Sequence, residues 1–436
     1  MSLGKVHMFA GASIRTGSVG VIAAGILLLS SANVQANKFK LWLMGGPTGK
    51  VAEALTALES GRIADADELF RQAIAANPDA IVATLGRAQI AITERHLSAA
   101  DKAVSDVLRR QPDLPEAHNM RAVVLLLQNK TAESRTEFMK AIALNPRFVT
   151  PHLYLAAMAR AASDYPEAIR EYQELTRLAP RLPAGYIGKA EAQMTTGKSA
   201  DAFATLGDWK VADPKSTLPF QVIAAIHMAN GLPRSALDEL RGAMRLDARD
   251  PATLTALGGA HLALGEVPAA TAQFTLALSI DASYAMARLG LADIALRSGD
   301  LEGAKTAYRA VLKLDAENTV AQNNLAWILA DQGRDLEEAL KLAQAAAKRE
   351  PEYVDGQDTL GWVHYKRAEY ARAIAAFSKA KSLAPTRGDI AAHLGMAYAK
   401  AGRKQEALTE LRRALLLKGE LSNRREVETL VATLAQ

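Results

Sequence analysis

The chain has 436 residues, of which 49% are hydrophobic and only 5% are aromatic. Its 52 basic and 47 acidic residues leave a net charge of +5, and no run of lysine and arginine is interleaved with aromatics, which argues against a nucleic-acid-binding protein. The absence of cysteine excludes disulfides, thiol catalysis and a lipid anchor on cysteine.

The N-terminal segment has the layout of a secretion signal. Basic residues, without any acidic one, precede an apolar stretch at 19–29, and small residues at 30–36 follow, ending in a cleavage site after Ala36. An apolar stretch of 11 residues is shorter than the roughly 20 that span a bilayer. We therefore expect residues 1–36 to be a signal peptide that directs the protein to the periplasm. The alternative is an uncleaved segment that anchors the chain in the inner membrane.

A short linker, residues 37–46, precedes the main body of the chain. The sequence GGPTGK, residues 45–50, invites comparison with a phosphate-binding loop. It has three residues between its glycines where that loop has four, and Val51 stands where serine or threonine would bind magnesium. We interpret it as the turn that leads into the first helix.

A period of 34 residues organises the chain from 47 to 421. Prolines recur at this spacing, alanine replaces them in three later units, and one spacing of 35 indicates a residue inserted within 333–336. A period of this length indicates a repeat architecture of small stacked units. The markers are Pro78, Pro112, Pro146, Pro180, Pro214, Ala248, Ala282, Ala316, Pro351 and Pro385.

Two columns of small residues, 12 apart, predict two helices in close contact in every unit. The first column is Ala54, Ala88, Ala122, Ala156, Ala190, Ala224, Gly258, Ala292, Ala326, Gly361 and Gly395. The second is Ala66, Ala100, Ser134, Ala168, Ala202, Ala236, Ala270, Ala304, Ala339, Ala373 and Ala407. Between them a glycine-rich column, which starts at Gly61 and ends at Gly402, predicts a left-handed residue that stops the first helix.

The stretch GWVHYKRAEYARAIAAFSKAKSLAP resembles the tetratricopeptide repeat. The resemblance rests on Leu360, Gly361, Tyr365, Ala373, Phe377, Ala380 and Pro385, and it covers 11 units in residues 47–421. It implies an all-α, right-handed superhelical solenoid of stacked helix-turn-helix hairpins, with roughly three quarters of its residues in helices. Residues 422–436 predict a last helix that caps the array.

Signals for chemistry are absent from the sequence. His118 and His152 are 34 residues apart, as are His227 and His261, but two histidines fall short of the three or four ligands that zinc needs. No nucleophile–base set, carboxylate pair or glycine-rich cofactor motif stands out. We therefore expect no catalytic, cofactor-binding or metal-binding residues, and a protein that is not an enzyme.

The family resemblance implies a concave groove that is lined by the second, fifth, ninth and twelfth places of each repeat. In the ninth and tenth repeats this face becomes aromatic and polar. We expect a protein or peptide partner to bind here, whereas the alternative is that both tryptophans only pack between helices. A sugar-bearing ligand could also stack on the two rings. The candidate residues are Asn323, Asn324, Trp327, Asp355, Asp358, Trp362 and Tyr365.

The groove departs from the carboxylate clamp of chaperone-binding family members. That clamp uses asparagines together with lysine and arginine. Here Asp355 and Thr359 follow Asn323 and Asn324 where a basic pair would be needed. We therefore do not expect the groove to capture an acidic C-terminus.

Residues 323–346 and 358–380 are also similar to the C-terminal repeats of exported bacterial tetratricopeptide proteins that accompany exopolysaccharide export or PEP-CTERM protein sorting. This similarity implies a periplasmic scaffold whose partners are components of an envelope complex. The alternatives are a general periplasmic partner-binding or chaperone-like protein and, behind both, an envelope enzyme. Contact with a membrane is expected only through an uncleaved N-terminal segment.

Overall fold

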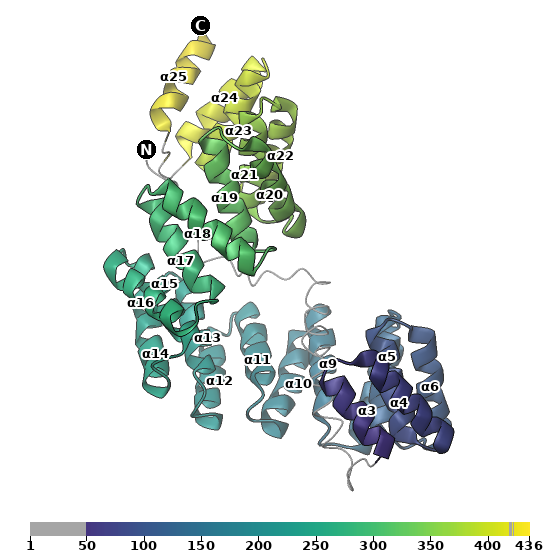
Figure 1. The fold of residues 1–436 in the computed structure, drawn as a ribbon. Helices are drawn as coiled ribbons and strands as arrows, with labels where there is room; N and C mark the ends of the chain where they lie inside the picture. The colour runs from purple at the N-terminus through teal and green to yellow at the C-terminus, as the bar shows by residue number, and fades with distance from the viewer. Residues whose placement is uncertain (1–48, 418–420, 422) are drawn as a thin grey trace. The chain divides into compact units, whose positions relative to one another are not determined.

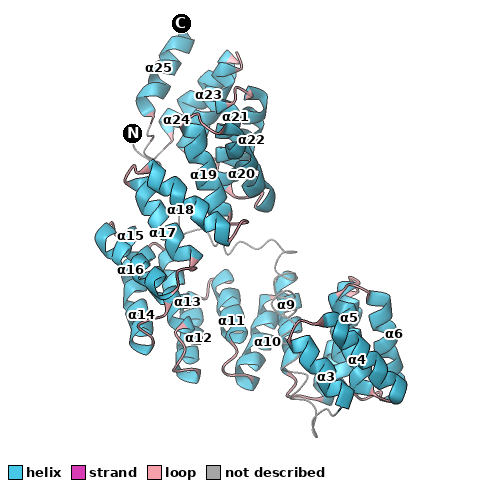
Figure 2. Cartoon of the chain, in the orientation of Figure 1, coloured by secondary structure: helices cyan, strands magenta, loops and turns pink. Residues whose placement is uncertain are grey.

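The structure is a computed structural model that describes residues 49–417, 421 and 423–436. The predicted signal peptide and the linker, residues 1–36 and 37–46, lie outside the described residues. Within the described part, 23 helices hold about 80% of the residues and no strand occurs, as Figure 2 shows. The prediction of an all-α repeat protein is confirmed.

The helices alternate between a first and a second helix of each repeat, followed by one last helix, α25 (Arg424–Ala435). The first helices are α3 (Gly49–Glu59), α5 (Ile81–Thr93), α7 (Pro115–Leu127), α9 (Val149–Ala161), α11 (Pro183–Thr195), α13 (Leu218–Ala229), α15 (Pro251–Ala263), α17 (Ala285–Arg297), α19 (Thr319–Asp331), α21 (Val354–Lys366) and α23 (Gly388–Lys400). The second helices are α4 (Ile63–Ala76), α6 (Leu97–Arg110), α8 (Thr131–Leu144), α10 (Tyr165–Leu178), α12 (Ser199–Ala212), α14 (Pro233–Leu246), α16 (Val267–Ile280), α18 (Leu301–Leu314), α20 (Leu336–Arg349), α22 (Tyr370–Leu383) and α24 (Lys404–Leu416).

The described chain divides into two compact units, which meet in sequence at residues 219 and 220. Within the first unit each helix from α3 to α12 packs on the next, and within the second unit the same holds from α14 to α25 (Figure 1). First helices also contact the first helix of the next repeat, as α15 does with α17 and α19 with α21. The hairpins therefore stack in the manner predicted.

Local sequence signals set where helices begin. Proline occupies the first position of α7, α11 and α15, where its missing N–H is not needed by the helix. Asp164 accepts a hydrogen bond from the backbone N–H of Glu167 at 3.1 Å, and Asp300 accepts one from Gly303 at 2.9 Å. These side chains satisfy N–H groups that the helix itself leaves unpaired.

The small-residue columns lie at the contact between the two helices of each repeat. Every residue of the second column is fully buried, and the alanines of the first column are no more than 3% exposed. In the third repeat the contact is direct, because the Ser134 hydroxyl donates a hydrogen bond to the Ala122 carbonyl at 2.7 Å. Side chains of this size allow the helix backbones to approach closely.

In six of the 11 repeats an aromatic side chain of the second helix fills the space that the small residues leave. Phe70, Phe138, Phe274 and Phe377 are fully buried and stand at the same place in their repeats. A Cβ atom added at Gly290 would lie 2.4 Å from the Cζ atom of Phe274, so the first helix of the next repeat presses against this ring. The core is thus a row of similar contacts that passes from repeat to repeat.

The glycine-rich column adopts the predicted left-handed conformation in all 11 repeats, including those in which it is not glycine. The non-glycine members are Arg95, Asn129, Ser163 and Ala368. The inserted residue is also found where it was predicted. The turn between α19 and α20 spans residues 332–335, whereas the turn between α17 and α18 spans 298–300, and Asp335 is a second left-handed residue with φ 49°.

Ala368 provides a test of this turn, because a residue with a Cβ atom is strained at its φ of 58°. We expect Ala368→Gly to raise the local opening free energy of α21 and α22 by about 1 kcal/mol. The reverse change at the equivalent position, Gly402→Ala, should lower that of α23 and α24 by a similar amount. Hydrogen exchange measured by mass spectrometry reports both. A stabilising effect of both substitutions, or of neither, would show that the backbone conformation is not the source of strain.

Candidate functional site in the second unit

The predicted site residues come together on two neighbouring helices. Asn323, Asn324 and Trp327 lie on α19, the other four lie on α21, and the two helices pack on each other. We call the second, fifth, ninth and twelfth places of the first helices the groove face. All of the predicted residues except Asn324 occupy these places.

The two tryptophans are both partly buried. Trp327 and Trp362 pack against the same hydrophobic cluster, which includes Leu325, Leu329 and Val363. Each ring therefore contributes one part to the core and leaves another part accessible. Their role in binding stays a prediction.

Trp362 is held in place by its neighbours on several sides. Its ring stacks on Tyr365 with centroids 5.3 Å apart, and it lies 5.0 Å from the ring of His393 on α23. Lys366 places its Nζ atom 4.9 Å from the Trp362 centroid, a cation–π contact. The result is a pre-ordered aromatic surface, which limits the conformational entropy that binding would cost.

Asp358 forms a buried pair with His393 from the next repeat. The Nδ1 atom of His393 lies 2.9 Å from one carboxylate oxygen of Asp358. Burial disfavours the charged imidazole, but the charge of Asp358 and its hydrogen bond outweigh burial and hold the pKa of His393 above its usual value. The ring of His393 also contacts the buried ring of Phe377, so the pair joins the candidate site to the core.

Asp355 also forms an ion pair with a residue that precedes the first helix of the next repeat. Arg387 donates hydrogen bonds to Asp355 and to Asp389. Burial opposes the charge of Arg387, yet its bonds and charge interactions with the two carboxylates raise the pKa of the guanidinium. The bond between Arg387 and Asp355, which are 32 residues apart, therefore joins α21 to the start of α23.

The two asparagines of α19 differ in their surroundings. The Nδ2 atom of Asn324 donates to the hydroxyl of Tyr308 on α18 at 3.0 Å, and Asn323 donates to Asn324, also at 3.0 Å. Both side chains are buried, with exposed fractions of 5% for Asn323 and 4% for Asn324. Asn324 is therefore used in packing between the helices of the stack, and only Asn323 occupies the groove face.

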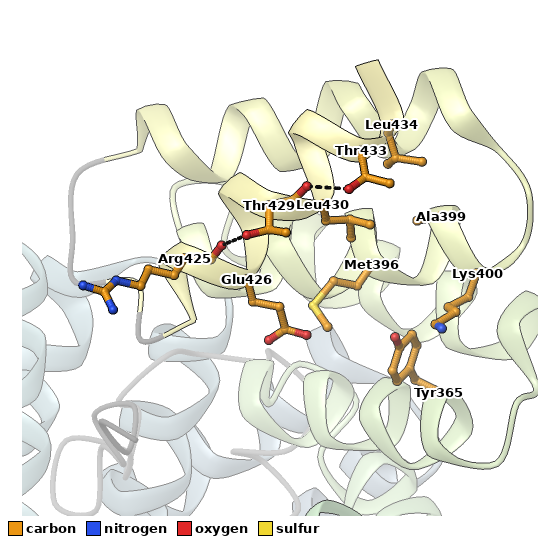
Figure 3. Close-up of a pocket in the computed structure, with 10 residues that line it drawn as sticks. All are labelled: Tyr365, Met396, Ala399, Lys400, Arg425, Glu426, Thr429, Leu430, Thr433 and Leu434. Atoms are coloured by element: carbon orange, nitrogen blue, oxygen red, sulfur yellow. Dashed lines mark hydrogen bonds between the residues drawn. The ribbon is translucent and has the colours of Figure 1, made fainter. Parts of the chain in front are cut away.

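The groove face continues onto α25, beyond the residues that sequence reasoning selected. A pocket of 550 Å³ is lined from α21, α23 and α25, as Figure 3 shows. Met396 and Leu430 are 34 residues apart, so α25 takes the place of a further first helix, and Val427, one turn before Leu430, is fully buried. The 34-residue period could have found this extension. The lining residues at groove-face places are Tyr365, Met396, Ala399, Glu426, Leu430 and Thr433.

Two histidines of the first unit join the two helices of their own repeats. His118 contacts Glu137 at 2.6 Å, and its counterpart one repeat later, His152, contacts Glu171 at 2.7 Å. In the described part of the chain, no group of three or more histidine, aspartate or glutamate side chains is arranged to hold a metal ion. Helices long and apolar enough to cross a membrane are likewise not found among the described residues.

Sequence models of the tetratricopeptide repeat match residues 57–124, 155–217, 289–354, 333–388 and 359–421, which together make up more than half of the chain. With the stacked hairpins and the left-handed turns, they show that the chain belongs to the tetratricopeptide repeat family. Proteins of this family are typically non-enzymatic interaction scaffolds that bind peptide or protein partners.

Among individual proteins, the chain is similar to a DnaJ homolog subfamily C member 7 homolog of Schizosaccharomyces pombe, with 22% identity over 180 residues. That similarity covers 38% of each of the two chains. Among solved structures it is similar to the APC/C hetero-tetramer Cut9–Hcn1, with a TM-score of 0.52, 10% identity and coverage of 96% of this chain and 99% of the other. It is also similar to yeast Tom70, with a TM-score of 0.42, 14% identity and coverage of 88% and 95%. These likenesses concern the fold alone.

The His393–Asp358 pair predicts a dependence of stability on pH. A histidine whose folded pKa is raised stabilises the fold below its unfolded pKa of about 6.5, and this contribution is lost as the pH rises through the folded value. We expect the free energy of unfolding of the second unit to fall as the pH rises above about 6.5. The variant Asp358→Asn should show a flatter profile. Urea unfolding followed by circular dichroism at several pH values measures both, and parallel profiles would contradict the assignment.

Proposed function

We propose that the protein is a non-enzymatic scaffold of the bacterial periplasm that holds a segment of a partner protein on the groove face of its last repeats. The observation that carries the proposal is the partly exposed, pre-ordered aromatic surface of Trp327 and Trp362, which carboxylates and amides surround. Rigid aromatic anchors of this kind dominate the energetics of many protein interfaces. The family membership supports a role in protein–protein interaction.

The partner that we propose is a component of an envelope assembly or exopolysaccharide export system. The similarity of residues 323–346 and 358–380 to exported bacterial repeat proteins supports this proposal. The second candidate is a general periplasmic partner-binding or chaperone-like protein. It is favoured by the apolar positions of the groove face, such as Met396 and Leu430, which would accept many segments. Gene neighbours separate the two, because only the first requires genes for an envelope complex nearby.

Export has its own test in the N-terminus of the mature protein. If residues 1–36 are a cleaved signal, mass spectrometry of the native protein should find Asn37 at its N-terminus, in the periplasmic fraction. An intact Met1 in the membrane fraction would favour the anchored alternative. An intact Met1 in the cytosolic fraction would contradict export.

The groove proposal is tested by truncating both rings. We expect Trp327→Ala, Trp362→Ala to stay folded, because parts of both side chains lie outside the core, and to lose the partner by about 2 kcal/mol or more. The measurement is retention of the native partner by the full chain, in a pull-down from solubilised membranes of its own host, beside a thermal melt. Unchanged retention by a folded variant would refute the groove assignment.

A tryptophan that only packs provides the control. Trp209 in the first unit is fully buried and stacks on Tyr186 with centroids 5.6 Å apart. Its truncation to alanine should cost about 3–5 kcal/mol in stability. Because it lies in the first unit, a preparation in which the second unit is folded should still retain the partner. Loss of the partner in both variants would point to unfolding as the common cause.

A further inference from the structure

The groove face of the last repeats is acidic at its own positions. From α17 to α25 it carries five carboxylates and neither lysine nor arginine. The carboxylates are those of Asp293, Asp355, Asp358, Asp389 and Glu426. Apolar and aromatic residues, including Trp327, Trp362, Tyr365, Met396 and Leu430, occupy most of the other places.

The cations that border this face are largely engaged. Arg387 binds Asp355 and Asp389, and His393 binds Asp358. Lys366 lies over Trp362 and 3.9 Å from Asp331. Two basic residues line the pocket, but Lys400 is exposed at its rim and Figure 3 shows the side chain of Arg425 directed away from the other lining residues. Apart from these two exposed side chains, the basic groups that border the groove face are already paired with carboxylates or with an aromatic ring.

Three buried polar atoms of the groove face lack a hydrogen-bond partner among the described residues: two acceptors, on Asn323 and Asp293, and one donor, the Nε1 atom of Trp362. Asn323 is 5% exposed and its Oδ1 atom is buried without a partner among the described residues. Asp293 is fully buried, and one of its carboxylate oxygens binds Arg297 at 2.7 Å while the other, Oδ1, has no partner within the described chain. Both belong to one cluster. Asn323 donates a hydrogen bond to Asn324, which donates one to Tyr308, and the nearby charge of Asp293 helps to raise the pKa of the Tyr308 hydroxyl.

Unpaired buried acceptors cost free energy until a donor reaches them. Lysine and arginine side chains supply donors, carry the charge that complements the carboxylates, and gain cation–π contacts on tryptophan and tyrosine. Glutamate and aspartate supply none of these. The chemistry of the groove face thus favours a partner segment that carries positive charge.

We propose that the partner segment is a basic one, in which lysine or arginine residues alternate with apolar side chains. The apolar residues pack on Trp327, Trp362 and the pocket beside α25, and the cations pair with the groove-face carboxylates that remain partly exposed, those of Asp355, Asp389 and Glu426. This inference rests on the proposed function, since it concerns the same surface. It names the chemical class of the segment that the surface receives.

The overall charge of the protein makes the inference easy to test. The chain has a net charge of +5, so non-specific attraction favours an acidic peptide over a basic one. We suggest two labelled peptides of about twelve residues that differ only in having lysine or glutamate alternate with leucine and tyrosine. Fluorescence anisotropy with the full chain should show tighter binding of the lysine peptide, weakened by added salt.

Three charge substitutions sharpen the experiment. Glu426 lines the pocket and makes no ion pair with a described residue, so Glu426→Lys should weaken the lysine peptide about fivefold. Lys400→Glu on the opposite rim should tighten it by a similar factor. Glu428 lies on the same helix outside the pocket and pairs with Arg424, so Glu428→Lys is the matched control and should leave affinity within about twofold.

The outcomes separate this inference from the proposed function. Equal or tighter binding of the glutamate peptide, or binding of neither peptide, overturns the basic-partner inference. If the native partner is still lost from Trp327→Ala, Trp362→Ala in either case, the groove proposal stands. If the lysine peptide binds tightly but its affinity is unchanged by Glu426→Lys and Lys400→Glu, the peptide binds elsewhere, and this result also overturns the inference.

Discussion

The close contact between two columns of small side chains is the constraint on which the rest of the structure depends. Each repeat brings a residue no larger than alanine in its first helix against alanine or serine in its second. This contact allows one aromatic ring, such as Phe274, to reach both Gly258 of its own repeat and Gly290 of the next. The same feature therefore sets the spacing within a hairpin and between hairpins, and packing at this density tolerates few changes in volume.

The regular stack explains why the groove face can vary while the fold does not. The small column and the groove face lie on different sides of each first helix, so residues at the groove face do not have to be small enough for the close contact within the hairpin. In the last repeats that freedom is used for carboxylates and two tryptophans. Their partners come from the following repeat, as His393 does for Asp358 and Arg387 for Asp355. The surface is thereby rigid before any partner arrives.

The sequence was sufficient for the periodic features and insufficient for the contacts between repeats. The helix pairs, the left-handed turns and the inserted residue near Asp335 followed from spacing alone, because they depend on residues within one unit. The pairing of Asp358 with His393 and the packing of Asn324 on Tyr308 did not, since each requires knowing which side chains of adjacent helices meet. The sequence predicts the last helix, α25, only as a cap on the array. Its place on the groove face becomes visible when the 34-residue period is carried on from Met396 to Leu430.

The most direct measurement compares two leucine substitutions on α16. Ala270 belongs to the small column and is fully buried, whereas Ala272 on the same helix is exposed. Unfolding by urea should show that Ala270→Leu lowers the free energy of unfolding of the second unit by about 1–3 kcal/mol or more. Ala272→Leu should change it by no more than about 0.5 kcal/mol. Equal effects of the two substitutions would contradict the dependence of the stack on the small-residue contact.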